Sequence, residues 1–195
     1  MLFPKLTGFA RIGIRSSDNS QSIIGLYAVD DDETLTAYHE AGHAVIAYAL
    51  GGTVDSLQLW GEADQWLPER FGDCRINWGK VDPNSDWQRQ REILTILAGP
   101  VAEMVYRGEP YHPAHYGPWQ DDWQRAWTTC QALAPSPERR TMLLEGMMRQ
   151  LNAHVRSDRC WAAIAALADE LAAHEVLERE QVAEILRFWI HSAHS

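Results

Sequence analysis

The pentapeptide His39-Glu40-Ala41-Gly42-His43 combines two metal-binding side chains with a carboxylate. Residues four apart lie on one face of an α-helix, so the imidazoles of His39 and His43 can bind one ion together. Zn²⁺ accepts neutral imidazole, and a catalytic zinc site uses three protein ligands and keeps a fourth position for water. A glutamate beside that water can accept its proton. We therefore interpret the pentapeptide as an HExxH motif, with His39 and His43 as metal ligands and Glu40 as the catalytic residue.

A third ligand must come from elsewhere in the chain. The residues directly after His43 lack the glycine and third histidine of a metzincin. Glu62 follows His43 by 19 residues, near the thermolysin-like spacing, but a glycine-rich turn is the wrong context. Asp122 is the favoured candidate, because it stands at an expected helix start after a loop rich in His, Pro and Trp. His112 and His115 in that loop could also supply a ligand, although such residues more often lie on the surface or behind the ligands.

Other residues could line or support the site. Glu103 could orient a ligating histidine, and a solvated or structurally paired glutamate is an equally good interpretation. Seven tryptophans fall on both sides of the expected cleft, and packing in a small core explains them better than a peptide-binding groove does. These are Trp60, Trp66, Trp78, Trp87, Trp119, Trp123 and Trp127.

The elements that position the motif are mostly helical. The helix that carries it is expected from Thr34 to Leu50 and is apolar nearly all round, which predicts burial. Val54 to Trp60 and Cys74 to Trp78 alternate with period two and predict a small antiparallel ribbon. A second helix is expected from Asp86 to Arg107, with a kink at Gly99-Pro100 because proline removes a backbone hydrogen bond.

The second half of the chain predicts further helices. Residues 109–120 contain three prolines and are expected to be a loop. A helix is expected from Asp121 or Asp122 to Ala134, followed by three more, which are Glu138 to Ser157, Cys160 to His174 and Glu178 to His191. The predicted fold class is mainly α with a small antiparallel β ribbon.

Length and charge narrow the class of protein. The 195 residues suit one domain, which we place at residues 34–192 behind an N-terminal arm of residues 1–33 with two strand candidates. A net charge of −10 argues against a nucleic-acid partner, because phosphate binding needs clustered Lys and Arg. Three cysteines without a CxxC pair suit a reducing compartment. We expect no signal peptide and no membrane span, and therefore a cytoplasmic protein.

Three segments resemble the FtsH-type ATP-dependent zinc metalloproteases. Thr36 to Ala44 is similar to the active-site helix of that family, and Leu97 to Glu103 is similar to its second signature, with Pro100 in place of an arginine. Asp121 to Ala126 resembles the third signature, in which an aspartate is the zinc ligand, and its register selects Asp122. The resemblance extends over about residues 34 to 190.

The resemblance implies an FtsH-like peptidase domain in which Zn²⁺ is held by His39, His43 and Asp122. It implies an endopeptidase that cleaves a peptide or unfolded protein substrate with a metal-activated water. We expect no ATPase module and no membrane segments within this sequence. A separate ATPase that delivers substrate and a homo-oligomer are both compatible with the pattern. The chief alternative is a non-catalytic module of the same fold that keeps zinc and binds peptides or a partner ATPase. A zinc hydrolase that acts on small substrates is a second, lower-ranked alternative.

Overall fold

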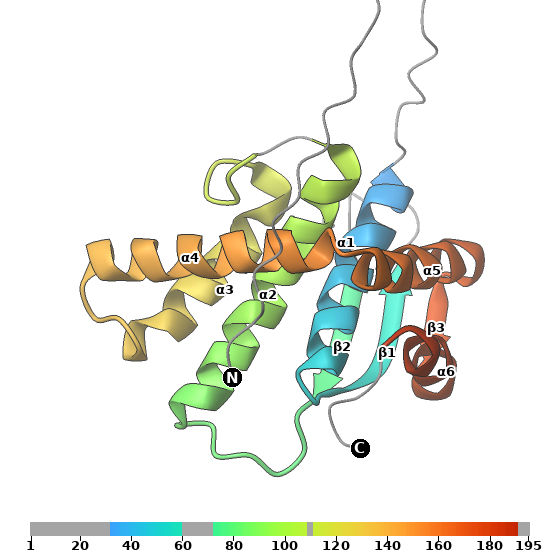
Figure 1. The fold of residues 1–195 in the computed structure, drawn as a ribbon, viewed down its shortest axis with the longest axis horizontal. Coiled ribbons are helices and arrows are strands. Elements are labelled where there is room, and N and C mark those ends of the chain that lie inside the picture. Colours follow the sequence, from blue (N-terminus) through green and yellow to red (C-terminus); the bar gives the residue numbers. More distant parts are fainter. Residues whose placement is uncertain (1–31, 60–71, 109–110, 191–195) are drawn as a thin grey trace, which may run out of the picture.

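The computed structural model describes residues 32–59, 72–108 and 111–190 (Figure 1). Helices make up most of this part of the chain and a three-stranded sheet completes it. The principal elements are α1 (Asp32–Ala49), β1 (Thr53–Leu59), β2 (Gly72–Asn77), α2 (Asp86–Arg107), α3 (Gln120–Thr129), α4 (Pro137–Val155), α5 (Asp158–His174), β3 (Val176–Glu178) and α6 (Arg179–Trp189). Short 3₁₀ turns flank α3 at Gly117–Trp119 and Cys130–Ala132. The predicted class, mainly α with a small antiparallel β component, is confirmed.

The helices α1 and α2 form an antiparallel pair that carries most of the site (Figure 1). They approach closely because Gly42 faces Ala98 and Ala102. A Cβ on Gly42 would lie 2.6 Å from the carbonyl oxygen of Ala98 and 2.6 Å from Cβ of Ala102. Real side chains do not reach such separations, so the missing side chain of Gly42 sets the distance between the two helices.

Local signals at the ends of α2 agree with the structure. The Ser85 hydroxyl accepts a 3.0 Å hydrogen bond from the backbone N–H of Gln88, which caps the helix start. Gly108 ends the helix with φ at 71°, a left-handed conformation that glycine adopts without strain. The helix continues through Pro100, so the turns before and after the proline belong to one element.

The remaining helices close the hydrophobic core around this pair. In Figure 1, α4 and α5 run across α2 and α1, and α6 lies beside the sheet. Fully buried leucines and isoleucines from β1, α2, α4 and α5 meet there, so packing of apolar faces rather than any single helix holds the arrangement. They include Leu57, Ile93, Leu97, Leu144, Ile164, Leu167 and Leu171.

The sheet differs from the predicted ribbon by one strand. β1 lies in the centre, pairing antiparallel with β2 on one side and with β3 on the other. We expected a helix to begin at Glu178, whereas Val176–Glu178 forms β3 and α6 begins at Arg179. Three residues are too short for alternation to be recognised, and their pairing with β1 depends on a contact about 120 residues away. The helix expected to reach Ala134 ends at Thr129.

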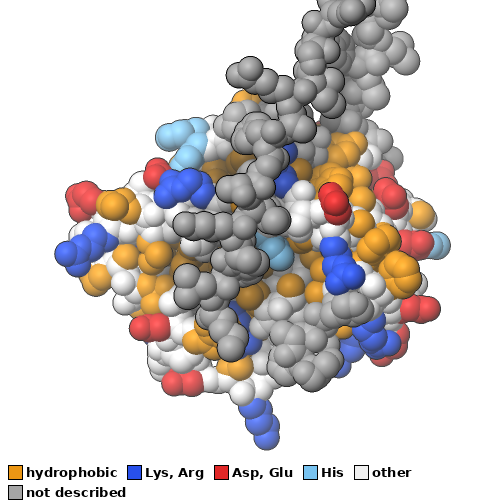
Figure 2. Space-filling view, in the orientation of Figure 1, with side chains coloured by type: hydrophobic (Ala, Val, Ile, Leu, Met, Phe, Trp, Pro, Cys, Tyr) orange, Lys and Arg blue, Asp and Glu red, His pale blue; other side chains and the backbone are white. Residues whose placement is uncertain are grey.

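Charges are mixed on the visible surface. Figure 2 shows Lys and Arg side chains scattered among acidic and hydrophobic ones on this face, with no single basic patch. Within the described residues, no helix combines the length and the apolarity that crossing a bilayer requires. The two strand candidates of the N-terminal arm lie outside the described residues.

Candidate metal centre

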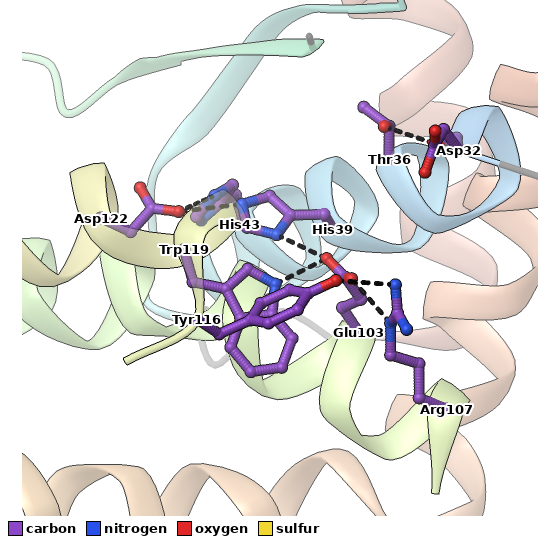
Figure 3. A network of polar contacts seen from close by, with 9 residues as sticks. All are labelled: Asp32, Thr36, His39, His43, Glu103, Arg107, Tyr116, Trp119 and Asp122. Carbon is purple, nitrogen blue, oxygen red and sulfur yellow. Dashed lines mark hydrogen bonds and ion pairs between the residues drawn. The ribbon is translucent and has the colours of Figure 1, made fainter. Parts of the chain in front are cut away.

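The side chains of His39, His43 and Asp122 meet in one buried cluster, although 83 residues separate the first from the last. His39 and His43 project from consecutive turns of α1, and Asp122 comes from the first turn of α3 (Figure 3). Their candidate ligand atoms all lie within 4.8 Å of one another. Nε2 of His39 lies 2.8 Å from Oδ2 of Asp122, and Nε2 of His43 lies 3.6 Å from the same oxygen.

The other nitrogen of each ring has a partner that fixes the ring's orientation. Nδ1 of His43 lies 2.8 Å from the backbone carbonyl oxygen of Thr95 and can only donate to it. Nδ1 of His39 lies 3.4 Å from Oε2 of Glu103. Ligating histidines characteristically donate one N–H to a carbonyl or carboxylate, which leaves the lone pair of the other nitrogen for the metal. With Nδ1 held as the donor in each ring, a metal that displaces the Nε2 proton would find both Nε2 lone pairs facing Asp122.

Gly99 of α2 leaves room beside the two imidazoles. A Cβ at this position would lie 2.7 Å from Nε2 of His39 and closer still to Nε2 of His43. In a tetrahedral zinc site, ligand atoms about 2.0–2.2 Å from the ion are roughly 3.3–3.5 Å apart. The distances of 2.8 and 3.6 Å from Asp122 to the two histidines bracket that range. The donor types and these separations therefore fit a divalent ion with nitrogen and oxygen ligands.

The electrostatics of the cluster favour the ionised form of the Asp122 side chain. Burial raises the pKa of Asp122, but the charges and hydrogen bonds of His43 and His39 outweigh it and hold the pKa well below its usual range. Burial lowers the pKa of His39, and the hydrogen bonds to Asp122 and Glu103 outweigh it and raise the pKa to about 10. Arg125 lies 3.5 Å from Oδ1 of Asp122, which leaves Oδ2 for the histidines.

Glu40 lies between the histidines in sequence and is 7% exposed. Its side chain packs against the first residue of β2, because a Cβ on Gly72 would lie 2.7 Å from Oε1 of Glu40. Burial is the main cause of a raised pKa for Glu40, and the nearby histidines oppose it. A carboxylate whose pKa is raised by burial binds an abstracted proton more readily than an exposed one, which suits a general base.

A buried network joins the supporting residues (Figure 3). The Glu103 side chain is 0% exposed and accepts a 3.0 Å hydrogen bond from Nε of Arg107 and a 2.7 Å hydrogen bond from Nε1 of Trp119. Arg107 also donates to the hydroxyl of Tyr116 over 2.9 Å. Since Trp119 lies three residues before Asp122, Glu103 connects the helix of one ligand to the turn that leads to the other. The sequence offered Glu103 as one of two open interpretations, and the structure places it directly beside His39.

The cluster forms part of the wall of a cavity of about 1130 Å³. Residues of α1, β2, α2 and α3 all contribute to its lining. Glu40 and the three candidate ligands all line the cavity. A ligand in this space can therefore reach the metal position and the candidate base together.

The structure resolves several of the alternatives. His112 contacts both His115 and Trp123, and neither histidine joins the cluster of ligand atoms. Glu62 lies outside the described residues, as do Trp60 and Trp66. Of the described tryptophans, Trp78 lines the cavity. Burial in the core, which we favoured, accounts for two others, Trp119 and Trp123.

No family model matches the chain, and no curated protein has a sequence significantly similar to it.

Proposed function

We propose that this chain is a zinc-dependent endopeptidase, a relative of the FtsH-type protease domain in which His39, His43 and Asp122 hold the metal and Glu40 is the general base. The observation that carries the proposal is the convergence of two imidazole nitrogens, a carboxylate oxygen and a buried glutamate at one cavity. When bound, a divalent ion of this kind supplies Lewis acidity to a water molecule and to a substrate carbonyl.

Glu40 transfers the proton in the proposed reaction, and other residues position the metal ligands. Glu40 takes a proton from the attacking water, whose oxygen bonds to the scissile carbonyl carbon. As the C–N bond breaks, Glu40 gives that proton to the leaving amine nitrogen. Thr95 and Glu103 hold the two imidazole rings in place throughout. The cavity is large enough for several residues of an extended peptide, which suits an endopeptidase.

The test compares Glu40→Gln with Glu33→Gln, an exposed glutamate in the first turn of the same helix. Both proteins are loaded with Zn²⁺, their metal content is measured by elemental analysis, and cleavage of an unfolded protein is followed by mass spectrometry. We expect Glu40→Gln to retain the metal and to lose roughly 10²–10⁴-fold in rate, the usual contribution of a general base. Glu33→Gln should retain both metal and activity.

Two results would overturn the proposal. One is full activity in Glu40→Gln. The other is a wild-type protein that binds Zn²⁺ stoichiometrically yet cleaves nothing in a broad panel of peptides and unfolded proteins. The second result would favour the non-catalytic, peptide-binding alternative.

A further inference from the structure

The cavity extends away from the metal cluster along helix α2. Glu92, Ile96, Gly99 and Glu103 recur at intervals of three and four residues and so share one face of the helix. Gly99 lies beside the imidazoles, and Glu103 lies beside His39. Glu92 precedes Gly99 by seven residues, which places it about 10 Å away along the helix axis. This end of the cavity, lined by Ile76, Trp78, Glu92, Thr95 and Ile96, is called the Glu92 subsite below.

The walls of the Glu92 subsite are mainly apolar, with one carboxylate. Ile76 and Trp78 come from the end of β2 and the segment after it, and Ile96 comes from α2. Glu92 is half-buried, and its Oε1 accepts a 2.7 Å hydrogen bond from the side-chain amide of Gln88. That amide is neutral, so the negative charge of Glu92 is not compensated by it.

The neighbouring cation is engaged elsewhere. The guanidinium of Arg91 lies 4.7 Å above the ring of Trp78 and donates a 3.1 Å hydrogen bond to the carbonyl oxygen of Leu50. It also bonds to the side-chain oxygen of Gln88. Among the described residues, no Lys or Arg forms an ion pair with Glu92. A half-buried carboxylate without a cation is a favourable position for a cationic ligand group.

The net charge of the residues that line the whole cavity also favours a cationic ligand. Arg125 is the one Lys or Arg among the described lining residues, and it pairs with Asp122 at 3.5 Å. Against it stand six lining carboxylates, which are Glu40, Asp73, Glu92, Glu103, Asp121 and Asp122. Three of these belong to the metal centre and its support. Of the other three, Asp73 pairs with Arg75 and Asp121 is exposed, whereas Glu92 is half-buried beside apolar walls.

A second polar group on the same wall lacks a partner. Thr95 is 3% exposed, and its hydroxyl oxygen makes no hydrogen bond with any described residue. Thr95 lies nearly one helical turn beyond Glu92. An unsatisfied buried hydroxyl is unfavourable, and Thr95 is one of the residues that line this cavity.

We propose that the Glu92 subsite binds the side chain of a lysine or arginine in an extended peptide, so that the substrates are basic segments of protein. The long aliphatic stem lies against Ile76, Trp78 and Ile96, and the cationic end pairs with Glu92. The distance from the metal cluster to Glu92 is suitable. The roughly 10 Å along α2 between Gly99 and Glu92 corresponds to some three residues of extended chain, or to a single long side chain that starts next to the scissile bond. This inference rests on the proposed function, because the Glu92 subsite is a substrate site only if the chain is a peptidase.

The experiment uses the Zn²⁺-loaded Glu40→Gln protein, so that bound peptides are not consumed. A single lysine is moved through successive positions of a short neutral peptide, and each peptide is compared with its norleucine counterpart, which has nearly the same stem without the ammonium group. We expect the lysine peptide to bind about tenfold more tightly at one or two positions, the effect of a hydrogen bond to a charged group. Adding Glu92→Gln should remove this preference, and Glu92→Lys should reverse it in favour of a glutamate peptide.

Glu184→Gln, an exposed helical glutamate on α6 outside the cavity, is the matched control and should keep the preference for lysine. Equal binding of lysine and norleucine at every position would overturn the inference, as would a preference that survives Glu92→Gln. A wild-type protein that prefers lysine peptides but never cleaves them would leave the subsite standing and refute the proposed peptidase activity. Cleavage with no preference for basic residues would support the proposed peptidase activity and refute the Glu92 subsite.

Discussion

The indole N–H of Trp119 donates a 2.7 Å hydrogen bond to the same oxygen of Glu103 that lies 3.4 Å from His39. One buried carboxylate oxygen therefore serves both the ligand helix α1 and the turn before Asp122. Such a bridge can hold two ligands in register before any ion arrives. Preorganised ligands raise metal affinity because less order has to be created on binding.

Replacing Glu103 tests this bridge. We expect Glu103→Gln to weaken Zn²⁺ binding about 10- to 100-fold, the usual effect of losing a group that orients a ligating histidine. Trp119→Phe removes one donor but keeps an aromatic ring, so a smaller loss is expected. Competition with a chromogenic chelator measures the affinity, and Glu138→Gln, an exposed glutamate on α4, is the control. Unchanged affinity in a folded Glu103→Gln protein would contradict a positioning role.

Gly99 offers a sharper test, because the change adds only a methyl group. We expect Gly99→Ala to abolish stoichiometric Zn²⁺ binding, since the new Cβ would lie 2.7 Å from Nε2 of His39 and closer to His43. Gly146 in α4 is the matched control, because a Cβ there would meet only the end of the Arg149 side chain at 3.9 Å. Gly146→Ala should stabilise the protein by up to about 1 kcal/mol through helix propensity. Elemental analysis and thermal unfolding report both effects, and a folded Gly99→Ala protein with a full complement of zinc would refute the site geometry.

Proton release provides the third prediction. In the metal-free protein the pKa of His39 is raised to about 10, chiefly by Asp122 and Glu103 acting against burial. Zinc binds neutral imidazole, so binding near pH 7.5 should release a proton and the affinity should rise with pH. The raised pKa also means that this ion pair stabilises the metal-free protein fully below the ordinary histidine pKa of about 6.5. That stability is lost as the pH rises toward 10. Calorimetry in buffers of different ionisation enthalpy measures the released proton, and no buffer dependence would contradict the prediction.

The sequence predicted the site residues that lie on one helix, and only some of those that other elements contribute. His39, Glu40 and His43 follow from helical periodicity, because their spacing alone puts both imidazoles on one face. Asp122 needed a resemblance to a known signature to be chosen over Asp121, since nothing local shows that α3 meets α1. The carbonyl of Thr95 was missed because every residue has a backbone carbonyl.

From the sequence, Gly99 was expected to be part of a helix kink at Pro100. In the structure, the missing side chain of Gly99 leaves space for the two imidazoles. A glycine inside a helix costs about 1 kcal/mol relative to alanine, and that cost was the available signal for a role in packing. Which atoms occupy the space depends on how α1 packs against α2. Similarly, β3 became a strand because β1 was available beside it, and its own three residues carry no clear pattern.

The span of 83 residues between His39 and Asp122 has a consequence for unfolding. An ion held at both ends would act as a reversible cross-link that closes a loop containing β1, β2 and α2. Release of α3 from the rest of the protein would then require the ion to dissociate first. With the ion bound, local opening of α3 and global unfolding should merge into one cooperative event, whereas the metal-free protein can release α3 separately.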